Sequence, residues 1–296
     1  MSVVRKAQGT PATRFSEREF GICVTARMIE DGKTYWVAIG GGPLYAILLA
    51  QKLYTPTAMY ATEDGVIAPE PALPLDPLIV GVASRPNYRA LMWSTMNGLT
   101  EHAQLGYMDY GILNSLQVDP YGNINSTFIG AYPEEGRRMN GPGGADAIAS
   151  LCWRVILMVD HERRKFVPNV DFISSPGFLD GEKEARERAG LPRGTGPWRV
   201  VTPWAVFDHE DESHHLRLIA RAPFVTEEQI QQEMDFKPLL AGEIEVLEAP
   251  TEEELMVLRV ELDVRGQNTG VGRWVEQNDD GSWHFWEEKS AGGVSI

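Results

Sequence analysis

The sequence predicts an α/β protein with an open, mostly parallel sheet flanked by helices. Residues 34–39, "TYWVAI", are apolar on both faces, which is typical of a buried strand of a parallel sheet. A glycine-rich loop and an apolar helical run at 44–53 follow, and a second β-prone run occupies 57–62. Strand, helix and strand in such a short stretch make a βαβ unit, and this unit predicts parallel strands.

The remaining elements continue this alternation. Upstream, Phe20, Val24 and Met28 recur every four positions and predict a helix that ends at Asp31-Gly32. Two apolar runs flank the turn at 120–123, and two strands near residue 210 are expected to pair antiparallel around a polar hairpin. In chain order we expect strands at 77–84, 153–160, 198–208 and 216–222, and helices at 87–99, 226–234 and 251–262.

The two ends of the chain differ from this central part. Residues 1–16 read as a flexible lead-in because they lack the apolar core of a signal peptide. Near the other end, Trp274, Trp283 and Trp286 surround Asp280-Gly281, which predicts a small β hairpin. We favour a packing role for this hairpin over a ligand-binding role. The predicted divisions are a lead-in at 1–16, an α/β domain at 17–263 and a Trp-rich extension at 264–296.

Charge and cysteine content exclude several classes of function. The net charge of −15 argues against broad binding to a nucleic-acid backbone, which needs clustered Lys and Arg. No apolar run reaches the length of a membrane span, so we expect no membrane partner. Cys23 and Cys152 lie in no metal-binding motif and are expected to be buried, reduced thiols of a cytoplasmic protein.

The tripeptide Glu63-Asp64-Gly65 interrupts two apolar runs. Ligands of parallel α/β sheets bind beyond the carboxyl ends of the strands, and Glu63 directly follows the strand expected at 57–62. Gly65 permits tight backbone geometry at this point. Glu-Asp-Gly is a common turn composition, so the tripeptide alone favours a solvated turn acid over a role in chemistry.

Two glycine clusters precede predicted helices. Gly141, Gly143 and Gly144 lead into an alanine-rich helix, and their exposed N–H groups would suit an anion or a developing oxyanion. A flexible connector is the alternative interpretation. The other cluster, 40–42, departs from the dinucleotide-binding pattern because Tyr45 stands where its third glycine belongs.

Two charged segments are further candidates. Residues 160–166, "DHERRKF", offer a basic site for phosphate or carboxylate through Arg163, Arg164 and Lys165, or are simply a solvated surface. Residues 208–215, "DHEDESHH", contain potential metal ligands, yet a solvated hairpin is the favoured interpretation.

Five motifs in this order carry a resemblance to a known family. They are "TEDG", "QVDPYGNINSTFIG", "RRMNGPGGADAIA", "VILMVDHERRKFVPNVDFISSPGFLDG" and "GLPRGTGPWRVVT". Between about residues 32 and 263 the chain resembles the β subunits of family I CoA-transferases, of the glutaconate CoA-transferase type. The chain departs from these relatives at Asp64, where they place a small polar residue, and in its longer ends.

The resemblance implies a mechanism and assigns residues to it. Glu63 matches the nucleophile, which forms a glutamyl–acyl anhydride and then a glutamyl–CoA thioester, and Gly143 and Gly144 match the oxyanion hole. The implied fold is an open α/β sheet, and the implied partner is an α subunit in a heterotetramer or larger heteromer. The substrate is a coenzyme A thioester, and no tightly bound cofactor or metal is needed.

Further residues are candidates for binding the substrate or the phosphates of CoA. They are Tyr107, Asn125, Ser126, Arg137, Arg138 and Arg164.

Two other functions stay open at this point. A branch of the same superfamily opens ring-derived CoA thioesters with water, but its β-like subunits lack the acid that matches Glu63, so Glu63 favours transfer. The chain would alternatively be a non-catalytic subunit of such a complex.

Overall fold

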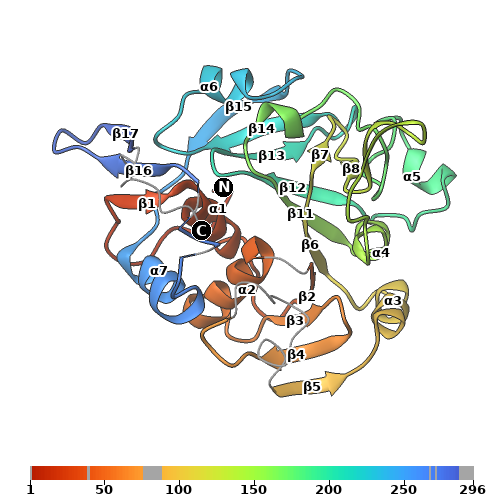
Figure 1. The fold of residues 1–296 in the computed structure, drawn as a ribbon, viewed down its shortest axis with the longest axis horizontal. Coiled ribbons are helices and arrows are strands. Elements are labelled where there is room, and N and C mark those ends of the chain that lie inside the picture. Colours follow the sequence, from red (N-terminus) through yellow and green to blue (C-terminus); the bar gives the residue numbers. More distant parts are fainter. Residues whose placement is uncertain (1, 39–40, 76–88, 267, 271, 287–296) are drawn as a thin grey trace.

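The computed structural model describes residues 2–38, 41–75, 89–266, 268–270 and 272–286, and a ten-stranded sheet lies at its centre (Figure 1). The strand order is β15-β14-β13-β12-β11-β6-β2-β3-β4-β5. The middle strands, from β12 to β3, run parallel, while β13, β4 and β5 pair antiparallel with their neighbours. The strands are β2 (Thr34–Val37), β3 (Met59–Thr62), β4 (Val66–Glu70), β5 (Arg89–Trp93), β6 (Tyr110–Asn114), β11 (Arg154–Met158), β12 (Pro197–Val201), β13 (Ala205–His209), β14 (Leu216–Arg221) and β15 (Leu239–Val246).

Helices and small sheets surround this sheet. The helices are α1 (Glu17–Ala26), α2 (Gly41–Leu53), α3 (Met96–Gln104), α4 (Ala145–Leu151), α5 (Ala185–Arg188), α6 (Glu227–Gln232) and α7 (Glu252–Met256), with a 3₁₀ turn η1 (Arg163–Lys165) and a π-helical turn η2 (Val257–Leu262). The short strands are β1 (Arg14–Ser16), β7 (Gln117–Val118), β8 (Ile124–Asn125), β9 (Phe128–Ala131), β10 (Glu135–Arg138), β16 (Trp274–Gln277) and β17 (Trp283–Trp286).

The predicted fold class is confirmed, with two elements corrected. The single strand expected at 198–208 is two strands, β12 and β13, which pair antiparallel across a turn at 202–204. The βαβ unit is present as β2, α2 and β3. The helix expected at 87–99 is wrong for 89–93, which form the edge strand β5 beside β4, and α3 begins only at Met96. Cross-strand pairing decided the outcome, because a short apolar run suits a strand as well as a helix. The strand expected at 77–84 lies outside the described residues.

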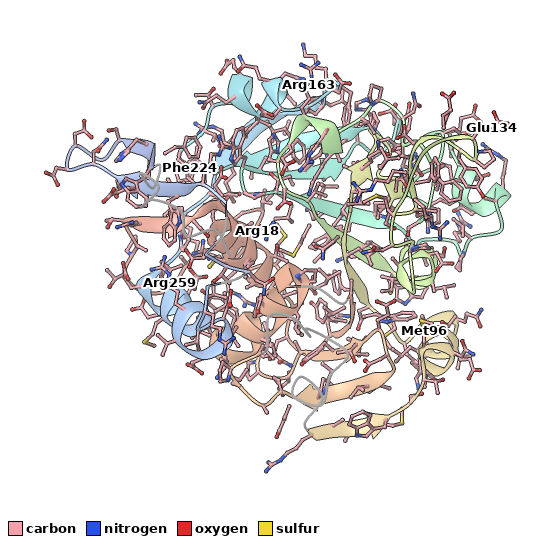
Figure 2. The ribbon with its side chains drawn as sticks, viewed as in Figure 1. Arg18, Met96, Glu134, Arg163, Phe224 and Arg259 are labelled. Atoms are coloured by element: carbon pink, nitrogen blue, oxygen red, sulfur yellow. The ribbon has the colours of Figure 1, made fainter. Side chains whose placement is uncertain are left out.

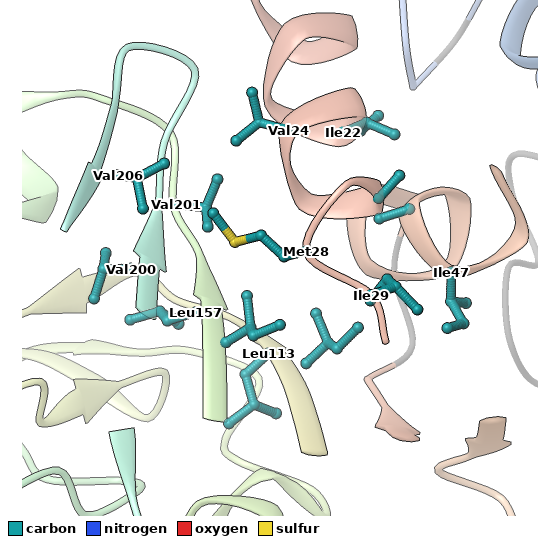
Figure 3. Close-up of a cluster of buried hydrophobic side chains, with 14 of the residues drawn as sticks. Ile22, Val24, Met28, Ile29, Ile47, Leu113, Leu157, Val200, Val201 and Val206 are labelled. Atoms are coloured by element: carbon teal, nitrogen blue, oxygen red, sulfur yellow. The ribbon is translucent and has the colours of Figure 1, made fainter. Parts of the chain in front are cut away.

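The helices cover both faces of the sheet. Strands β3 and β11 lie on opposite sides of the β2–β6 pair, so right-handed crossovers place α2 and α4 on opposite faces. Figure 1 shows α1 and α2 on one side of the central strands and α3 and α4 on the other. Figure 3 shows part of the core, where Met28, which follows α1, lies beside Val201 of β12, and Ile47 of α2 lies farther from the sheet.

The Trp-rich hairpin is confirmed, and it joins the two ends of the chain. β16 pairs with β17 and also with β1, in a three-stranded antiparallel sheet. The ring of Trp283 lies 5.4 Å from that of Phe15, so the hairpin packs on its own chain. The predicted lead-in also makes contacts, because Val3 N–H donates to Glu245 and Ala7 N–H donates to Glu248. The division at residues 16 and 263 stays a prediction.

No helix among the described residues is long and apolar enough to cross a membrane.

Candidate active site

Glu63 lies at the carboxyl edge of the sheet. It follows β3 in the tight turn to β4, where the Gly65 N–H donates to the Thr62 carbonyl oxygen (3.0 Å). Its side chain is half-buried. The neighbouring Asp64 accepts a hydrogen bond from the Thr62 hydroxyl, so this second carboxylate is held within the turn. The turn therefore presents Glu63 while it restrains Asp64.

Gly65 fixes this turn against the segment that leads into α3. Its φ is +103°, and a Cβ atom there would lie 2.6 Å from the backbone of Thr95. Its carbonyl oxygen accepts from Ser94 N–H (2.8 Å). This support is not apparent from the sequence when residues 87–99 are interpreted as one helix. The pair Ser94-Thr95 is the sequence signal for a helix that begins at Met96, since Thr95 is the N-cap of α3 and accepts a hydrogen bond from Gly98 N–H.

The glycine loop meets Glu63 directly. Gly144 N–H donates to Oε1 of Glu63 (2.8 Å), which joins residues 81 positions apart in the sequence. At Gly143 the φ is +56°, and a Cβ atom would lie 2.3 Å from the same oxygen. A side chain at position 143 would displace the carboxylate, so glycine is required by space as well as by backbone conformation. The structure thus brings Glu63, Gly143 and Gly144 together.

Met96, at the start of α3, borders the same contact. A Cβ atom at Gly144 would lie 3.5 Å from its sulfur, and Met96 is itself exposed (Figure 2). Leu91 and Trp93 of β5 are 77% and 63% exposed and lie on one face of the strand, since side chains alternate. An apolar surface formed by Leu91, Trp93 and Met96 therefore adjoins the Glu63 turn.

Asn125 and Ser126 belong to the segment that anchors the glycine loop. Asn125 is fully buried and donates to Gln117 Oε1 (2.7 Å) and the Phe128 carbonyl oxygen (2.6 Å), while its Oδ1 accepts from Thr127 N–H (2.9 Å). Its polar atoms are thus engaged within its own loop, where they shape that loop. The backbone of Ser126 accepts from Gly141 N–H (2.9 Å), so this motif anchors the loop that reaches Glu63.

The motif around Asp119 is structural in the same way. Burial raises the pKa of Asp119, although hydrogen bonds from Asn123 and Tyr121 oppose this effect. Asn123 also donates to the Leu179 carbonyl oxygen (2.7 Å), and its Oδ1 accepts from Gly177 N–H (2.9 Å). The motifs "DPYGN" and "SPGFLDG" thus form one layer of loops behind the site.

The candidate arginines and Tyr107 lie at different distances from the Glu63–Gly144 contact. Arg137 and Arg138 are exposed on β10, and Nη2 of Arg138 would lie 3.3 Å from a Cβ at Gly141, so this guanidinium borders the loop. Arg164 is exposed on η1 and pairs with Glu162. Tyr107 is 64% exposed, and its carbonyl oxygen contacts Thr34 at the amino end of β2. Because β2 and β3 are parallel, Tyr107 lies at the sheet edge opposite to Glu63.

The other charged segments are accounted for by local pairing. In 160–166 Lys165 pairs with Asp160 and Arg163 with Asp235. The segment 208–215 is the polar hairpin between β13 and β14, where Arg217 pairs with Asp208. Within the described part of the chain, no group of three or more His, Cys, Asp and Glu residues is arranged to hold a metal ion.

Comparison with known proteins gives one family. Residues 24–233 match the model of the family described as Coenzyme A transferase. The chain is 30% identical to the B-type subunit of glutaconate CoA-transferase of Acidaminococcus fermentans, over 85% of this chain and 94% of that protein. It is 31% identical to the B-type subunit of 3-oxoadipate CoA-transferase of Pseudomonas knackmussii, over 83% and 92%. The cholesterol ring-cleaving hydrolase IpdB subunit of Rhodococcus jostii is 29% identical over 52% of this chain and 59% of its own.

The fold gives the same result. The crystal structure of glutaconate coenzyme A-transferase from Acidaminococcus fermentans superposes with a TM-score of 0.80 at 27% identity. The superposition covers 86% of this chain and 98% of that one.

Proposed function

Because the chain belongs to the coenzyme A transferase family, we propose that it is the B-type subunit of a CoA-transferase with Glu63 as its nucleophile. The observation that carries this proposal is the contact at the carboxyl edge of the sheet. There, the half-buried Glu63 accepts a hydrogen bond from the N–H of Gly144, and the neighbouring position 143 has no space for a side chain. A carboxylate so held is positioned to attack a thioester carbonyl bound above it.

The chemistry balances with this one residue. Glu63 attacks the thioester carbonyl and expels CoA as a thiolate, which leaves a mixed anhydride between Glu63 and the acyl group. The thiolate attacks the Glu63 carbonyl, so that CoA is bound to Glu63 as a thioester and the first acid departs. A second carboxylate attacks this thioester, and the same steps in reverse deliver its CoA ester. No electrons are exchanged overall, so the scheme needs no redox group and no tightly bound cofactor.

The position of Gly144 indicates which steps its N–H stabilises. It contacts Oε1 of Glu63 itself, at 2.8 Å. When the thiolate attacks the Glu63 carbonyl, negative charge develops on an oxygen of this same residue, where the N–H already points. We therefore propose that Gly144 serves the steps at the glutamyl carbonyl, with Gly143 giving the oxygen its space.

The candidates for binding differ in the support that they have. Arg138 borders the glycine loop, and we propose that Arg138, with Arg137 beside it on β10, contacts an anionic part of the acyl-CoA. Ser126 is proposed to act through the loop that its backbone anchors. Asn125, Tyr107 and Arg164 receive no support from their positions, and we assign no substrate contact to them.

The partner is proposed to be an A-type subunit that covers the apolar surface of β5 and Met96. Both CoA-transferase relatives are named as B-type subunits, which implies a second subunit in those enzymes. An exposed Leu and Trp on an edge strand promote aggregation when the chain is alone, and they are typical of a protein–protein interface. A cover at this place would also keep water from the anhydride. A heterotetramer or a larger heteromer is the expected assembly, and the two unpaired thiols support a cytoplasmic location.

Hydrolysis is the second candidate, because the hydrolase relative matches half of the chain. The discriminating experiment supplies the co-expressed two-subunit enzyme with acyl-CoA, with and without a second carboxylic acid. Transfer predicts that steady turnover requires the acid and that its CoA ester accumulates. Release of CoA at the same rate without any acceptor acid would show a hydrolase.

Asp64→Asn is the matched control for this assay. The amide oxygen still accepts from Thr62, so the turn is kept and activity is expected within about tenfold of the parent enzyme.

A further inference from the structure

The buried hydroxyl of Ser174 joins two loop segments that are distant in the sequence. Ser174 directly precedes the motif "SPGFLDG", and its Oγ accepts a hydrogen bond from Ser126 N–H (2.9 Å). The same Oγ lies 2.6 Å from Oγ1 of Thr127 and 3.4 Å from Oδ1 of Asn125. A serine hydroxyl has one proton to donate, so the shorter contact, with Thr127, is the one that uses it.

Ser126 and Thr127 in turn hold the start of the glycine loop. The carbonyl oxygen of Ser126 accepts a hydrogen bond from Gly141 N–H (2.9 Å), and that of Thr127 accepts one from Met139 N–H (2.8 Å). Ser174 contacts both of these residues, on the N–H of one and on the hydroxyl of the other. One side chain therefore fixes the segment to which the loop is attached.

The loop at 139–144 needs such support because of its glycines. The φ angles of Gly141 and Gly143 are +90° and +56°. Glycine has more conformational freedom than any other residue, so a loop rich in glycine does not keep one geometry by itself. At the far end of the loop Gly144 N–H donates to Oε1 of Glu63 (2.8 Å). A displacement of about 1 Å at a reacting group can lower a rate by about 100-fold.

We propose that Ser174 is a positioning residue for the CoA-transfer reaction. With Thr127 it fixes residues 126–127, and through the glycine loop it sets the place of Gly144 N–H at Glu63. This inference rests on the proposed function, since Glu63 must be the reacting carboxylate. Ser174 is buried and makes its polar contacts within the protein, so its loss is expected to lower kcat and to leave KM nearly unchanged.

The neighbouring Ser175 is a matched control. It is fully buried, and its Oγ has no hydrogen-bond partner in the described parts of the chain. The N–H groups of Ser174 and Ser175 both donate to the carbonyl oxygen of Ile124, at 2.8 and 3.1 Å, and alanine at either position keeps these bonds. The two alanine variants thus remove the same group from adjacent buried positions, and only Ser174→Ala removes the contacts with residues 126–127.

The first test compares the steady-state kinetics of these two variants in the co-expressed two-subunit enzyme. Ser174→Ala is expected to lower kcat by about 10- to 100-fold and to change KM by less than about twofold. Ser175→Ala is expected to keep kcat within about twofold of the parent enzyme. Equal kcat values in the two variants, or a change in KM alone, would overturn the proposal.

Thr127 provides a second pair of variants, which decides the outcome if Ser174→Ala does not fold. Thr127→Val removes the hydroxyl at nearly constant volume, and it is expected to lower kcat by about 3- to 10-fold because Ser174 loses one of its two short contacts. Thr127→Ser keeps the hydroxyl and is expected to restore kcat to within about twofold. Equal kcat values in Thr127→Val and Thr127→Ser would overturn the proposal.

A double variant tests whether Ser174 acts through the glycine loop. Gly143→Ala already displaces the Glu63 carboxylate, so adding Ser174→Ala is expected to lower kcat by less than about threefold further. A role in general stability predicts the same loss in both backgrounds. A full 10- to 100-fold loss in the Gly143→Ala background would therefore contradict the proposal.

The time course of the intact mass with acyl-CoA separates this inference from the proposed nucleophile. The parent enzyme is expected to form a CoA adduct at Glu63, and Ser174→Ala to form it at least about fivefold more slowly. An adduct that forms in Ser174→Ala at the parent rate would overturn the role of Ser174 and leave the nucleophile in place. No adduct in the parent enzyme would overturn the nucleophile and, with it, this inference.

Discussion

Two glutamates of this chain, Glu63 and Glu254, are held in opposite ways. Glu254, on α7, is fully buried and accepts hydrogen bonds from Nε and Nη2 of Arg27, at 2.9 and 2.6 Å. It also accepts hydrogen bonds from the Tyr54 hydroxyl and the Thr251 N–H. Among the described residues, Glu63 has a single hydrogen bond, from Gly144 N–H, and is half-buried.

The difference is the one expected between a structural carboxylate and the proposed nucleophile. Glu254 has a counter-ion and donors for both oxygens, so its lone pairs are not available and its role is to join α7 to α1. Glu63 keeps an oxygen without a donor among the described residues, and its single donor points to where charge would develop in the proposed reaction. A carboxylate that is poorly satisfied at a sheet edge is therefore the better candidate for chemistry than one that is fully paired in the core.

The largest expected effect is the loss of activity in Glu63→Gln. Removing the nucleophile is expected to lower kcat on the order of 10⁴-fold or more, because no other residue can carry CoA between the two acids. Since the side chain has one hydrogen bond and is half-exposed, the free energy of unfolding is expected to change by less than about 1 kcal/mol. Steady-state kinetics and urea unfolding of the same preparation measure both quantities. Retained activity would assign the chain a non-catalytic role.

Glu254→Gln is expected to show the reverse. It leaves the buried guanidinium of Arg27 without its counter-ion, which costs about 3–5 kcal/mol of unfolding free energy. The activity of each folded molecule is expected to stay unchanged. The double variant Arg27→Met with Glu254→Leu removes both charges and is expected to lose less than the sum of the single variants. A single-variant loss below about 1 kcal/mol would contradict the structural role of this pair.

Gly143→Ala alters the site without removing any polar group. The added Cβ would lie 2.3 Å from Oε1 of Glu63, so the carboxylate must move, and kcat is expected to fall by about 10- to 100-fold. Gly190→Ala is the matched control, because Gly190 also has a positive φ, of +86°, but nothing within 4 Å of a Cβ. Both variants are expected to lose about 1 kcal/mol of stability, and only Gly143→Ala to lose activity. Equal activity in the two variants would remove Gly143 from the site.

Two buried histidines, His161 and His209, are expected to make the stability of the protein depend on pH. Burial lowers the pKa of His161 to about 4 and that of His209 to about 4, against 6.5 for an exposed histidine. The unfolded chain therefore binds more protons below pH 6.5, so their contribution is complete above that pH and is lost as the pH falls toward 4. As the pH falls from 6.5 to 5, each of the two histidines is expected to lower the free energy of unfolding by roughly 2 kcal/mol.

Urea unfolding at several pH values measures this slope. His161→Gln is expected to reduce the slope by about one proton. An unchanged slope in His161→Gln would show that this histidine is charged in the folded protein.

Much of the fold was predictable from local signals, and the site only in part. The capping pairs Thr226–Gln229 and Thr251–Glu254 form the capping boxes that their spacing predicts, and the βαβ unit follows from its apolar runs. The contact between Gly144 and Glu63 joins residues 81 positions apart, so no local sequence pattern could predict it. Only the resemblance of the motifs to a known family placed the two residues in one site.

Strand β5 and the contacts of Ser174 show where local patterns failed. The run at 89–93 is a strand only because β4 lies beside it, and its helical interpretation hid the apolar surface next to Glu63. Ser174 contacts Ser126 and Thr127 although they lie 48 and 47 positions away from it in the sequence. Spacing carries no information about such a pairing.

The most direct test of the account is the intact mass of this chain after the co-expressed enzyme meets acyl-CoA without an acceptor acid. We predict an increase by the mass of CoA less one water, located at Glu63, sensitive to borohydride and absent in Glu63→Gln. No adduct, with free acid and CoA accumulating together, would contradict a glutamyl–CoA intermediate and would show that water takes the acyl group.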